Sequence, residues 1–250
     1  MAGTALRGRL TWQVAKVESV TDETSTVRTI GLGLPDWPGH RAGQHLDVRL
    51  TAEDGYAAER SYSIASAPGE AVAITVERLA DGEVSPYLTQ ELRPGDEFEI
   101  RGPIGGYFVW DAADAPTPLL LLAGGSGIVP LRSILRHRDQ TGNGVPVSLL
   151  YSARSLPDVI YRAEIDRYAA NADVEVTYTL TRQSPPGWTG HTGRVDRQLL
   201  TELAWPASAG PLAFVCGPTA FVETVAELLV NLGYPAQRVK TERFGGMGEA

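Results

Sequence analysis

Cysteine and long apolar runs are scarce in this sequence, and each absence excludes a class of protein. The 250 residues contain one cysteine, Cys216, so neither an intrachain disulfide nor a cysteine-ligated iron–sulfur cluster or multi-cysteine zinc site can be built. The longest wholly apolar run, Leu119 to Ala123, is far shorter than the roughly 20 residues of a membrane-spanning helix. We therefore expect no transmembrane segment and no iron–sulfur domain.

Basic residues are in the minority as well. The 22 Lys and Arg against 30 Asp and Glu give a net charge of -8, which argues against nucleic-acid binding because phosphate neutralisation needs a basic surface. No two of the four histidines have the i, i+4 spacing of a helical metal site, so no metal is expected. Residues up to Trp12 lack the apolar stretch of a secretory signal, which predicts a cytoplasmic location.

Two differently patterned segments make up the chain. Up to about residue 110, short alternating strands are separated by turn residues, with one helix expected from Ser85 to Leu92. After an Ala/Pro-rich stretch at 112–118, short apolar strands alternate with helix-length amphipathic segments. Helices are expected at Pro130 to Arg138, Asp158 to Ala170, Arg197 to Leu203 and Thr219 to Leu232.

This change of pattern predicts a two-domain fold. Residues 1–113 should form an antiparallel β-barrel, and residues 114–250 an α/β domain whose parallel sheet is covered by helices on both faces. The first segment carries 10 basic and 17 acidic residues, whereas the second carries 12 and 13, which leaves arginines available there for an anion. Ligands of parallel sheets bind beyond the carboxyl ends of the strands.

A glycine loop follows the first strand of the second segment. Gly124, Gly125 and Gly127 lie between the apolar run and the helix that contains Pro130. Glycines let a backbone approach a diphosphate closely, and the exposed amides at a helix start favour an anion. A tight strand-to-helix turn without a ligand would look the same.

The first segment contains two possible anion contacts. Arg60 and Tyr62 alternate with Ser61 and Ser63, so one strand face offers a cation and an aromatic ring to the same ligand. Further along, Ser85 is expected to cap the helix that follows it. A solvated strand face and a plain capped helix are the alternatives.

Taken together and in this order, these segments resemble the ferredoxin-NADP reductase family from about Trp12 to Phe244, as a stand-alone FAD- and NAD(P)-binding oxidoreductase without an iron–sulfur domain. The resemblance implies that Arg60-Ser61-Tyr62-Ser63 is the flavin-binding signature. Arg60 would pair with the FAD diphosphate, Tyr62 would pack on the isoalloxazine, and Ser63 would hydrogen-bond near flavin N5. Residues assigned to the diphosphate through backbone amides are Gly82, Val84 and Ser85, and those lining the flavin or its ribityl chain are Val76 and Arg78.

On the nicotinamide side, the resemblance makes Gly124, Gly125, Gly127 and Pro130 the diphosphate loop. In Cys216-Gly217-Pro218, Cys216 would lie beside the nicotinamide, although a lone cysteine is often only a small apolar residue. Glu242 would assist proton handling near Cys216 and Ser63. Phe244 would lie against the flavin, but six residues follow it, unlike the plant-type pattern that ends on a stacked tyrosine.

The nucleotide preference depends on cations that meet an extra phosphate. Ser152 and Arg154 follow one strand, Arg182 follows the next, and Arg194 comes after a further turn. The resemblance matches all three arginines to positions that contact the 2'-phosphate in NADPH-using relatives, whereas an NADH enzyme more typically carries an acidic residue. Solvated loop arginines are the alternative, and NADH stays open as the donor.

The sequence therefore predicts a reductase that transfers a hydride from NADPH, or NADH, to FAD and passes electrons to a separate acceptor such as ferredoxin, in the service of a monooxygenase. We expect it to act as a monomer, without nucleic acid or membrane. One alternative is a reductase of free flavins or small quinone-like acceptors. Another is a nonenzymatic flavin-binding subunit of a larger complex.

Overall fold

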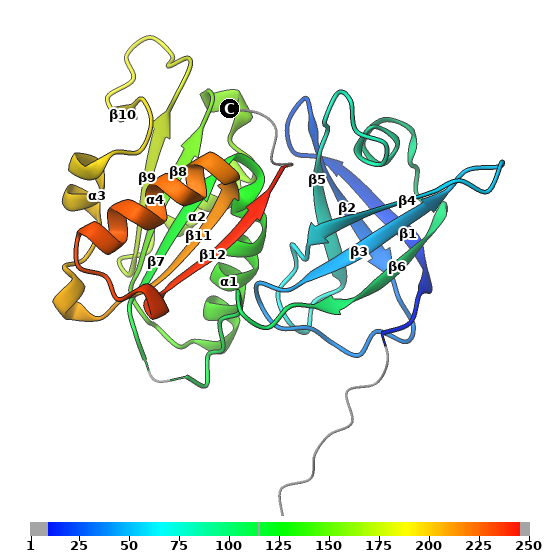
Figure 1. Ribbon diagram of the computed structural model, residues 1–250, viewed down its shortest axis with the longest axis horizontal. Helices are drawn as coiled ribbons and strands as arrows, with labels where there is room; N and C mark the ends of the chain where they lie inside the picture. Colours follow the sequence, from blue (N-terminus) through cyan, green and yellow to red (C-terminus); the bar gives the residue numbers. More distant parts are fainter. Residues whose placement is uncertain (1–9, 115, 246–250) are drawn as a thin grey trace, which may run out of the picture.

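The computed structural model describes residues 10–114 and 116–245, which fold into an antiparallel and a parallel sheet placed side by side (Figure 1). In this part of the chain the first sheet ends with a strand at Ile104, and the second begins at Leu119. The predicted two-domain fold class is confirmed. A division between residues 113 and 114 stays our proposal for the domain boundary.

The first sheet has the strand order β4-β3-β6-β1-β2-β5. A bridge between Ile64 and Ile74 joins the end of β4 to β5, so the sheet curls until its two edge strands meet. Inward side chains such as Leu46 and Ile100 are fully buried in the barrel. The strands are β1 (Gln13–Asp22), β2 (Val27–Gly33), β3 (His45–Thr51), β4 (Ala57–Ser63), β5 (Val72–Glu77) and β6 (Glu97–Ile104).

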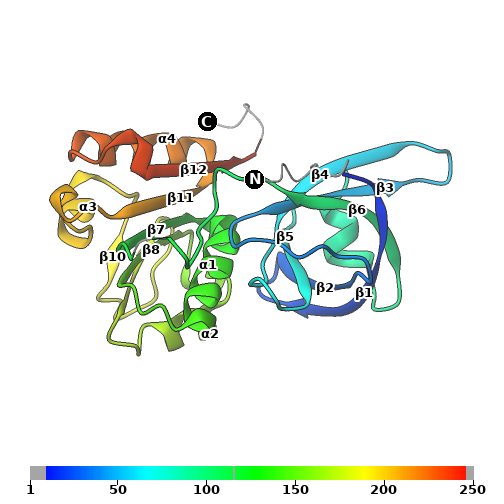
Figure 2. The ribbon, with the colours of Figure 1, turned by 90° about the horizontal axis from the view of Figure 1, so that it is seen from below.

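The second sheet is parallel, with the order β10-β9-β8-β7-β11-β12. Helices α1 (Ile128–Thr141) and α2 (Arg162–Tyr168) pack on one face, and α3 (Arg197–Leu203) and α4 (Thr219–Asn231) on the other (Figure 2). Central strands β7 and β8 are buried at every position because helices cover both faces. The strands are β7 (Leu119–Gly124), β8 (Val147–Ala153), β9 (Val174–Leu180), β10 (His191–Thr192), β11 (Leu212–Pro218) and β12 (Val239–Phe244).

Helix α1 extends beyond the predicted Pro130 to Arg138 by two residues at its start and three at its end, and two other predicted helices differ more strongly. The helix expected from Asp158 begins only at Arg162, because Tyr161 adopts a left-handed backbone with φ of 58°. The helix expected from Ser85 is a π-helical turn at Tyr87–Glu91. Its predicted cap is wrong: the Ser85 hydroxyl accepts a hydrogen bond from the Leu79 amide at 3.0 Å instead of from the helix.

No helix within residues 10–114 and 116–245 combines the length and the apolar character that a membrane crossing requires. The short strand β10 was not predicted, because two residues carry no alternation that a pattern could reveal.

Polar side chains of α1 join the two domains. Arg132 donates to the Ala65 carbonyl at 3.3 Å, and the Ser133 hydroxyl donates to the Ser66 carbonyl at 2.7 Å. Arg132 also lies 4.1 Å from the centroid of the Tyr161 ring. These contacts hold the chain just beyond β4 against the helix that follows the glycine loop.

Candidate functional site

A cavity of about 400 Å³ lies between the two domains where β4 and β12 approach each other. Its walls include Ser61 and Ser63 from β4 and Glu242 and Phe244 from β12. The structure thus brings together residues that are about 180 positions apart in the sequence and that were predicted to share one site. The other lining residues are Gly43, His45, Gly105, Gly106, Tyr107, Phe108, Thr241 and Arg243.

Cys216 and Glu242 are direct neighbours across β11 and β12. Cys216 is only 2% exposed, and burial, with the nearby Glu242 charge, raises the pKa of its thiol well above the usual value. Burial also raises the pKa of the Glu242 carboxyl to about 7. The thiol is therefore protonated and neutral at physiological pH, whereas Glu242 titrates near neutrality.

The segment Arg60-Ser61-Tyr62-Ser63, for which the resemblance implies flavin binding, lies along the end of β4. Arg60 and Tyr62 face one side of the strand and the two serines the other, as the alternation predicted. The Arg60 side chain is 51% exposed and pairs with Glu83. Tyr62 is half-buried against the barrel core, and burial raises the pKa of its hydroxyl. A cation and an aromatic ring are thus presented side by side at the edge of the barrel.

The segment before the π-helical turn offers two backbone amides. Gly82 donates its own amide to the Leu79 carbonyl at 3.0 Å, so that donor is taken by the turn. Among the described residues, the amides of Val84 and Ser85 have no hydrogen-bond acceptor, although both residues are buried. Two donors at this position suit a diphosphate, which is the ligand that the resemblance implies.

Val76 and Arg78 lie apart from the cavity between the domains. Val76 is fully buried in the barrel core. Arg78 lines a second cavity of about 480 Å³ next to the turn between β1 and β2, together with Arg28.

Close packing explains the glycine loop after β7. A Cβ atom added at Gly127 would lie 2.0 Å from the carbonyl oxygen of Cys216, so only glycine fits between the loop and β11. Gly125 has a φ of +54° in the left-handed region that favours glycine. Gly124 ends β7, and Pro130 lies in the first turn of α1. The loop is consequently held directly beside the strand end that carries Cys216, Gly217 and Pro218.

Three exposed arginines follow successive strands. Arg154 comes after β8, Arg182 after β9 and Arg194 after β10, and the Arg182 amide donates to the Arg154 carbonyl at 2.9 Å. Ser152, near the end of β8, is only 8% exposed. Within residues 10–114 and 116–245, none of these arginines forms an ion pair with a carboxylate. Their charges are available to an anion at this edge of the sheet.

Sequence reasoning missed two polar residues of the cavity. His45 begins β3, and burial lowers the pKa of its ring while Asp47 partly opposes that shift. Tyr107 is 60% exposed and donates its hydroxyl to the Val239 carbonyl at 3.1 Å across the two domains. A lone histidine and a loop tyrosine have no spacing that could have revealed them.

These arrangements fit both cofactors that the resemblance implies. The barrel edge offers Arg60, Tyr62 and two unpaired amides to a flavin dinucleotide, and the sheet edge offers a glycine loop and cations to a nicotinamide dinucleotide. Ser63 and Glu242 line the same cavity, so the two ligand sites meet there.

Comparison with known proteins likewise assigns FAD binding to the first part of the chain and NAD binding to the second. Residues 13–109 match the oxidoreductase FAD-binding domain family, and residues 121–227 match the oxidoreductase NAD-binding domain family. The chain is 36% identical over 211 residues to ferredoxin–NADP reductase B of Sorangium cellulosum, which covers 81% of this chain and 84% of that protein.

Other similarities extend over most of the chain. It is 33% identical over 234 residues to the glycine betaine monooxygenase reductase subunit of Pseudomonas aeruginosa, a match that spans 90% of this chain but only 62% of the relative. The fold is similar to that of the flavohem-like FAD/NAD-binding domain of nitric oxide dioxygenase from Vibrio cholerae, with a TM-score of 0.83 at 24% identity over 93% of this chain and 98% of that one. The chain combines an oxidoreductase FAD-binding domain with an oxidoreductase NAD-binding domain, and it belongs to the ferredoxin-NADP reductase family.

Proposed function

We propose that this protein is an FAD-dependent reductase that accepts a hydride from NADPH and passes electrons to a separate acceptor protein. One observation supports the proposal above all others. Along the sheet edge, the exposed Arg182 and Arg154 come first, then the glycine loop after β7, then Cys216, then Glu242. The same order of groups runs along NADPH, from the 2'-phosphate through the diphosphate to the nicotinamide.

Each residue of the barrel edge has a role in this scheme. When bound, FAD supplies the hydride acceptor and the electron carrier. Arg60 pairs with its diphosphate, Val84 and Ser85 donate amides to the same group, Tyr62 packs against the ring system, and Ser63 donates a hydrogen bond near the reacting edge. Phe244 lines the same cavity, where it would pack against the ring.

Glu242 handles protons beside that edge, and Cys216 lies next to it without a charge. A carboxyl with a pKa of about 7 holds or releases a proton over the physiological range. The buried, neutral thiol of Cys216 fills the space beside the nicotinamide without bringing a charge to it.

The preference for NADPH is tested by replacing Arg154 and Arg182 with alanine. If both read the 2'-phosphate, the Kd of NADPH should rise roughly tenfold per arginine while that of NADH changes little, as charge-assisted hydrogen bonds would require. Arg167→Ala, an exposed position on α2, is the matched control. Equal losses for NADPH and NADH would mean that neither arginine reads the phosphate.

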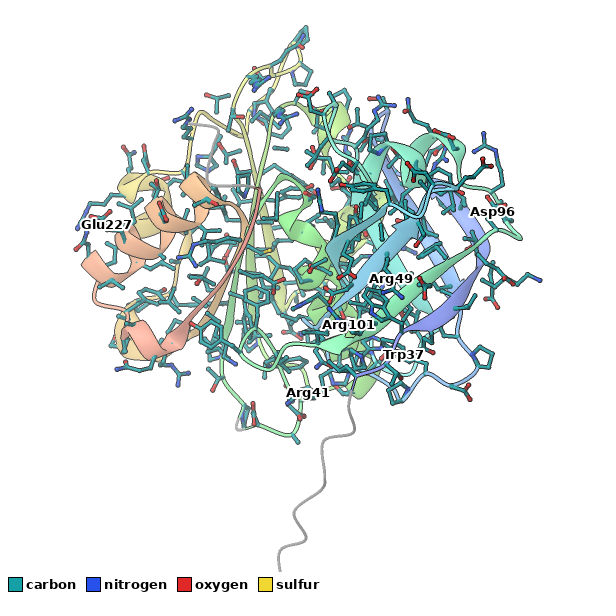
Figure 3. The ribbon with its side chains drawn as sticks, turned by 45° about the vertical axis from the view of Figure 1, so that its right-hand side comes forward. Trp37, Arg41, Arg49, Asp96, Arg101 and Glu227 are labelled. Atoms are coloured by element: carbon teal, nitrogen blue, oxygen red, sulfur yellow. The ribbon has the colours of Figure 1, made fainter. Side chains whose placement is uncertain are left out.

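The proposed acceptor is an acidic redox protein such as a ferredoxin that serves a monooxygenase. Arg243 lines the cavity, and the guanidinium of Arg41, labelled in Figure 3, lies 3.6 Å from a Cβ position built at Gly106 in its wall. Both arginines are exposed, so two cations at or near the cavity are available to an acidic partner. The two relatives named above are a monooxygenase reductase subunit and a ferredoxin–NADP reductase, which favours the same class of acceptor.

Anaerobic stopped-flow mixing tests the whole proposal. Addition of NADPH should bleach the yellow flavin absorbance within seconds, and addition of oxidised ferredoxin should restore it faster than free FMN or a quinone does. Faster recovery with free FMN would instead favour a flavin reductase. A protein that holds no FAD, or that NADPH and NADH both fail to bleach, would contradict the proposed function.

A further inference from the structure

A carboxylate of the barrel domain reaches into the glycine loop of the other domain. Glu77 is the last residue of β5, and its Oε2 accepts a hydrogen bond from the Ser126 hydroxyl at 2.8 Å. The same oxygen lies 4.0 Å from a Cβ position built at Gly125. Glu77 is thus located beside the central residues of the loop after β7, although it comes from a different sheet.

Strand geometry holds the Glu77 side chain in this direction. Glu77 and Thr75 are two residues apart on β5 and therefore face the same side. Thr75 contacts the hydroxyl of Tyr161, so this side of β5 faces the α/β domain. The position of the Glu77 carboxylate consequently follows from the packing of the two domains rather than from a freely rotating surface chain.

No cation neutralises this carboxylate within residues 10–114 and 116–245. Glu77 forms no ion pair there, and its hydrogen-bond donor is the uncharged hydroxyl of Ser126. An uncompensated negative charge at a loop that receives a diphosphate raises the free energy of the bound state, because like charges repel across a partly solvated gap. The Ser126 hydroxyl also cannot donate to a phosphate oxygen while it donates to Glu77.

We infer that Glu77 sets the dinucleotide affinity by competing with the ligand diphosphate for the Gly125–Gly127 loop. The inference rests on the proposed function, in which this loop binds the diphosphate of NADPH. Its consequence is a site that binds the dinucleotide more weakly, and releases it more readily, than the loop alone would. The carboxylate lowers the affinity for the dinucleotide and does not act on the transfer of the hydride.

Glu77→Gln is the direct test, because glutamine keeps the size and a hydrogen-bond acceptor for Ser126 while it removes the charge. Calorimetric titration of the FAD-loaded protein with ADP-ribose, which carries the diphosphate but no nicotinamide, should show binding about fivefold tighter than in the unaltered protein. AMP, which lacks the diphosphate, should bind equally well to both. Glu18→Gln removes an exposed charge of β1 in the same domain and should change neither Kd.

If Glu77→Gln does not fold, two further variants test the same inference. Glu77→Ala removes the same charge and should tighten ADP-ribose binding as well, whereas Glu77→Asp keeps the charge and should not. Unchanged or weaker ADP-ribose binding in the uncharged variants would overturn the inference, since it would make Glu77 neutral or helpful to binding. If no form of the protein binds ADP-ribose or NADPH, the proposed function falls along with it.

Discussion

Replacement of Glu242 by glutamine should remove a stability loss that the unaltered protein suffers as the pH rises from about 5.5 through 7. Burial raises the pKa of this carboxyl to about 7 from an ordinary value of 4.5. The folded state therefore holds the proton more tightly than the unfolded chain does. This contribution to the free energy of unfolding is complete below about pH 4.5 and is lost as the pH rises through 7. From about pH 5.5 to 9 the loss amounts to about 2 kcal/mol.

Thermal unfolding, followed by tryptophan and flavin fluorescence, measures this loss. For a chain of this size, about 2 kcal/mol corresponds to a decrease in Tm of roughly 4–8 °C. Glutamine does not titrate. The decrease in Tm over the same pH range should therefore be smaller for Glu242→Gln than for the unaltered protein, by roughly 4–8 °C. The difference between the two proteins removes the contributions of all other groups that titrate in both.

Glu227→Gln is the matched control, because Glu227 lies exposed on α4, at the outer edge of the α/β domain (Figure 3). Its Tm should follow that of the unaltered protein at every pH. Parallel pH curves for the unaltered protein and Glu242→Gln would refute the reasoning, since Glu242 would then titrate at the same pH in the folded and unfolded chains.

Three further substitutions test individual residues of the site. Arg60→Ala should lower the FAD content of the purified protein, measured by the ratio of flavin to protein absorbance; a full flavin complement would contradict its pairing with the diphosphate. Cys216→Ala should slow flavin reduction by NADPH about tenfold with FAD content retained, and unchanged stopped-flow rates would remove the thiol from the mechanism. Gly127→Ala forces a methyl group toward the Cys216 carbonyl, so its Tm should fall by several degrees, and a Tm equal to that of the unaltered protein would show that the loop can move aside.

The sequence carried enough information for the fold class and for the edge of the parallel sheet at which the candidate residues lie. Apolar runs such as Leu119 to Ala123 are typical of strands buried on both faces, and β7 is buried throughout. Once the sheet is parallel, every strand presents its carboxyl end at the same edge, so Cys216 and Arg154 could be assigned to one edge before their distances were known. Alternation in β4 likewise placed Arg60 and Tyr62 on a common face.

Features that depend on contacts between distant segments could not be read in this way. The Glu77–Ser126 hydrogen bond joins residues 49 positions apart, and neither residue stands out in its own strand or loop. The left-handed backbone of Tyr161 shortened the expected helix, although a bulky aromatic residue gives no local signal for that conformation. Ser85 is a residue type that commonly caps helices, but its hydroxyl accepts a hydrogen bond from the Leu79 amide and not from an amide of the helix.

One helix relates the two halves of the site to each other. Helix α1 begins directly after the glycine loop, and two turns further on its Ser133 and Arg136 contact the Ser66 carbonyl and the Glu70 carboxylate of the barrel domain. Ser66 lies three residues beyond Ser63. Ser63 is therefore connected to the glycine loop through only a short peptide segment and the first part of helix α1. Such elements deform little at ordinary temperature, because their backbone groups are already paired. The packing of α1 against the barrel domain therefore sets the spacing between the two proposed ligand sites.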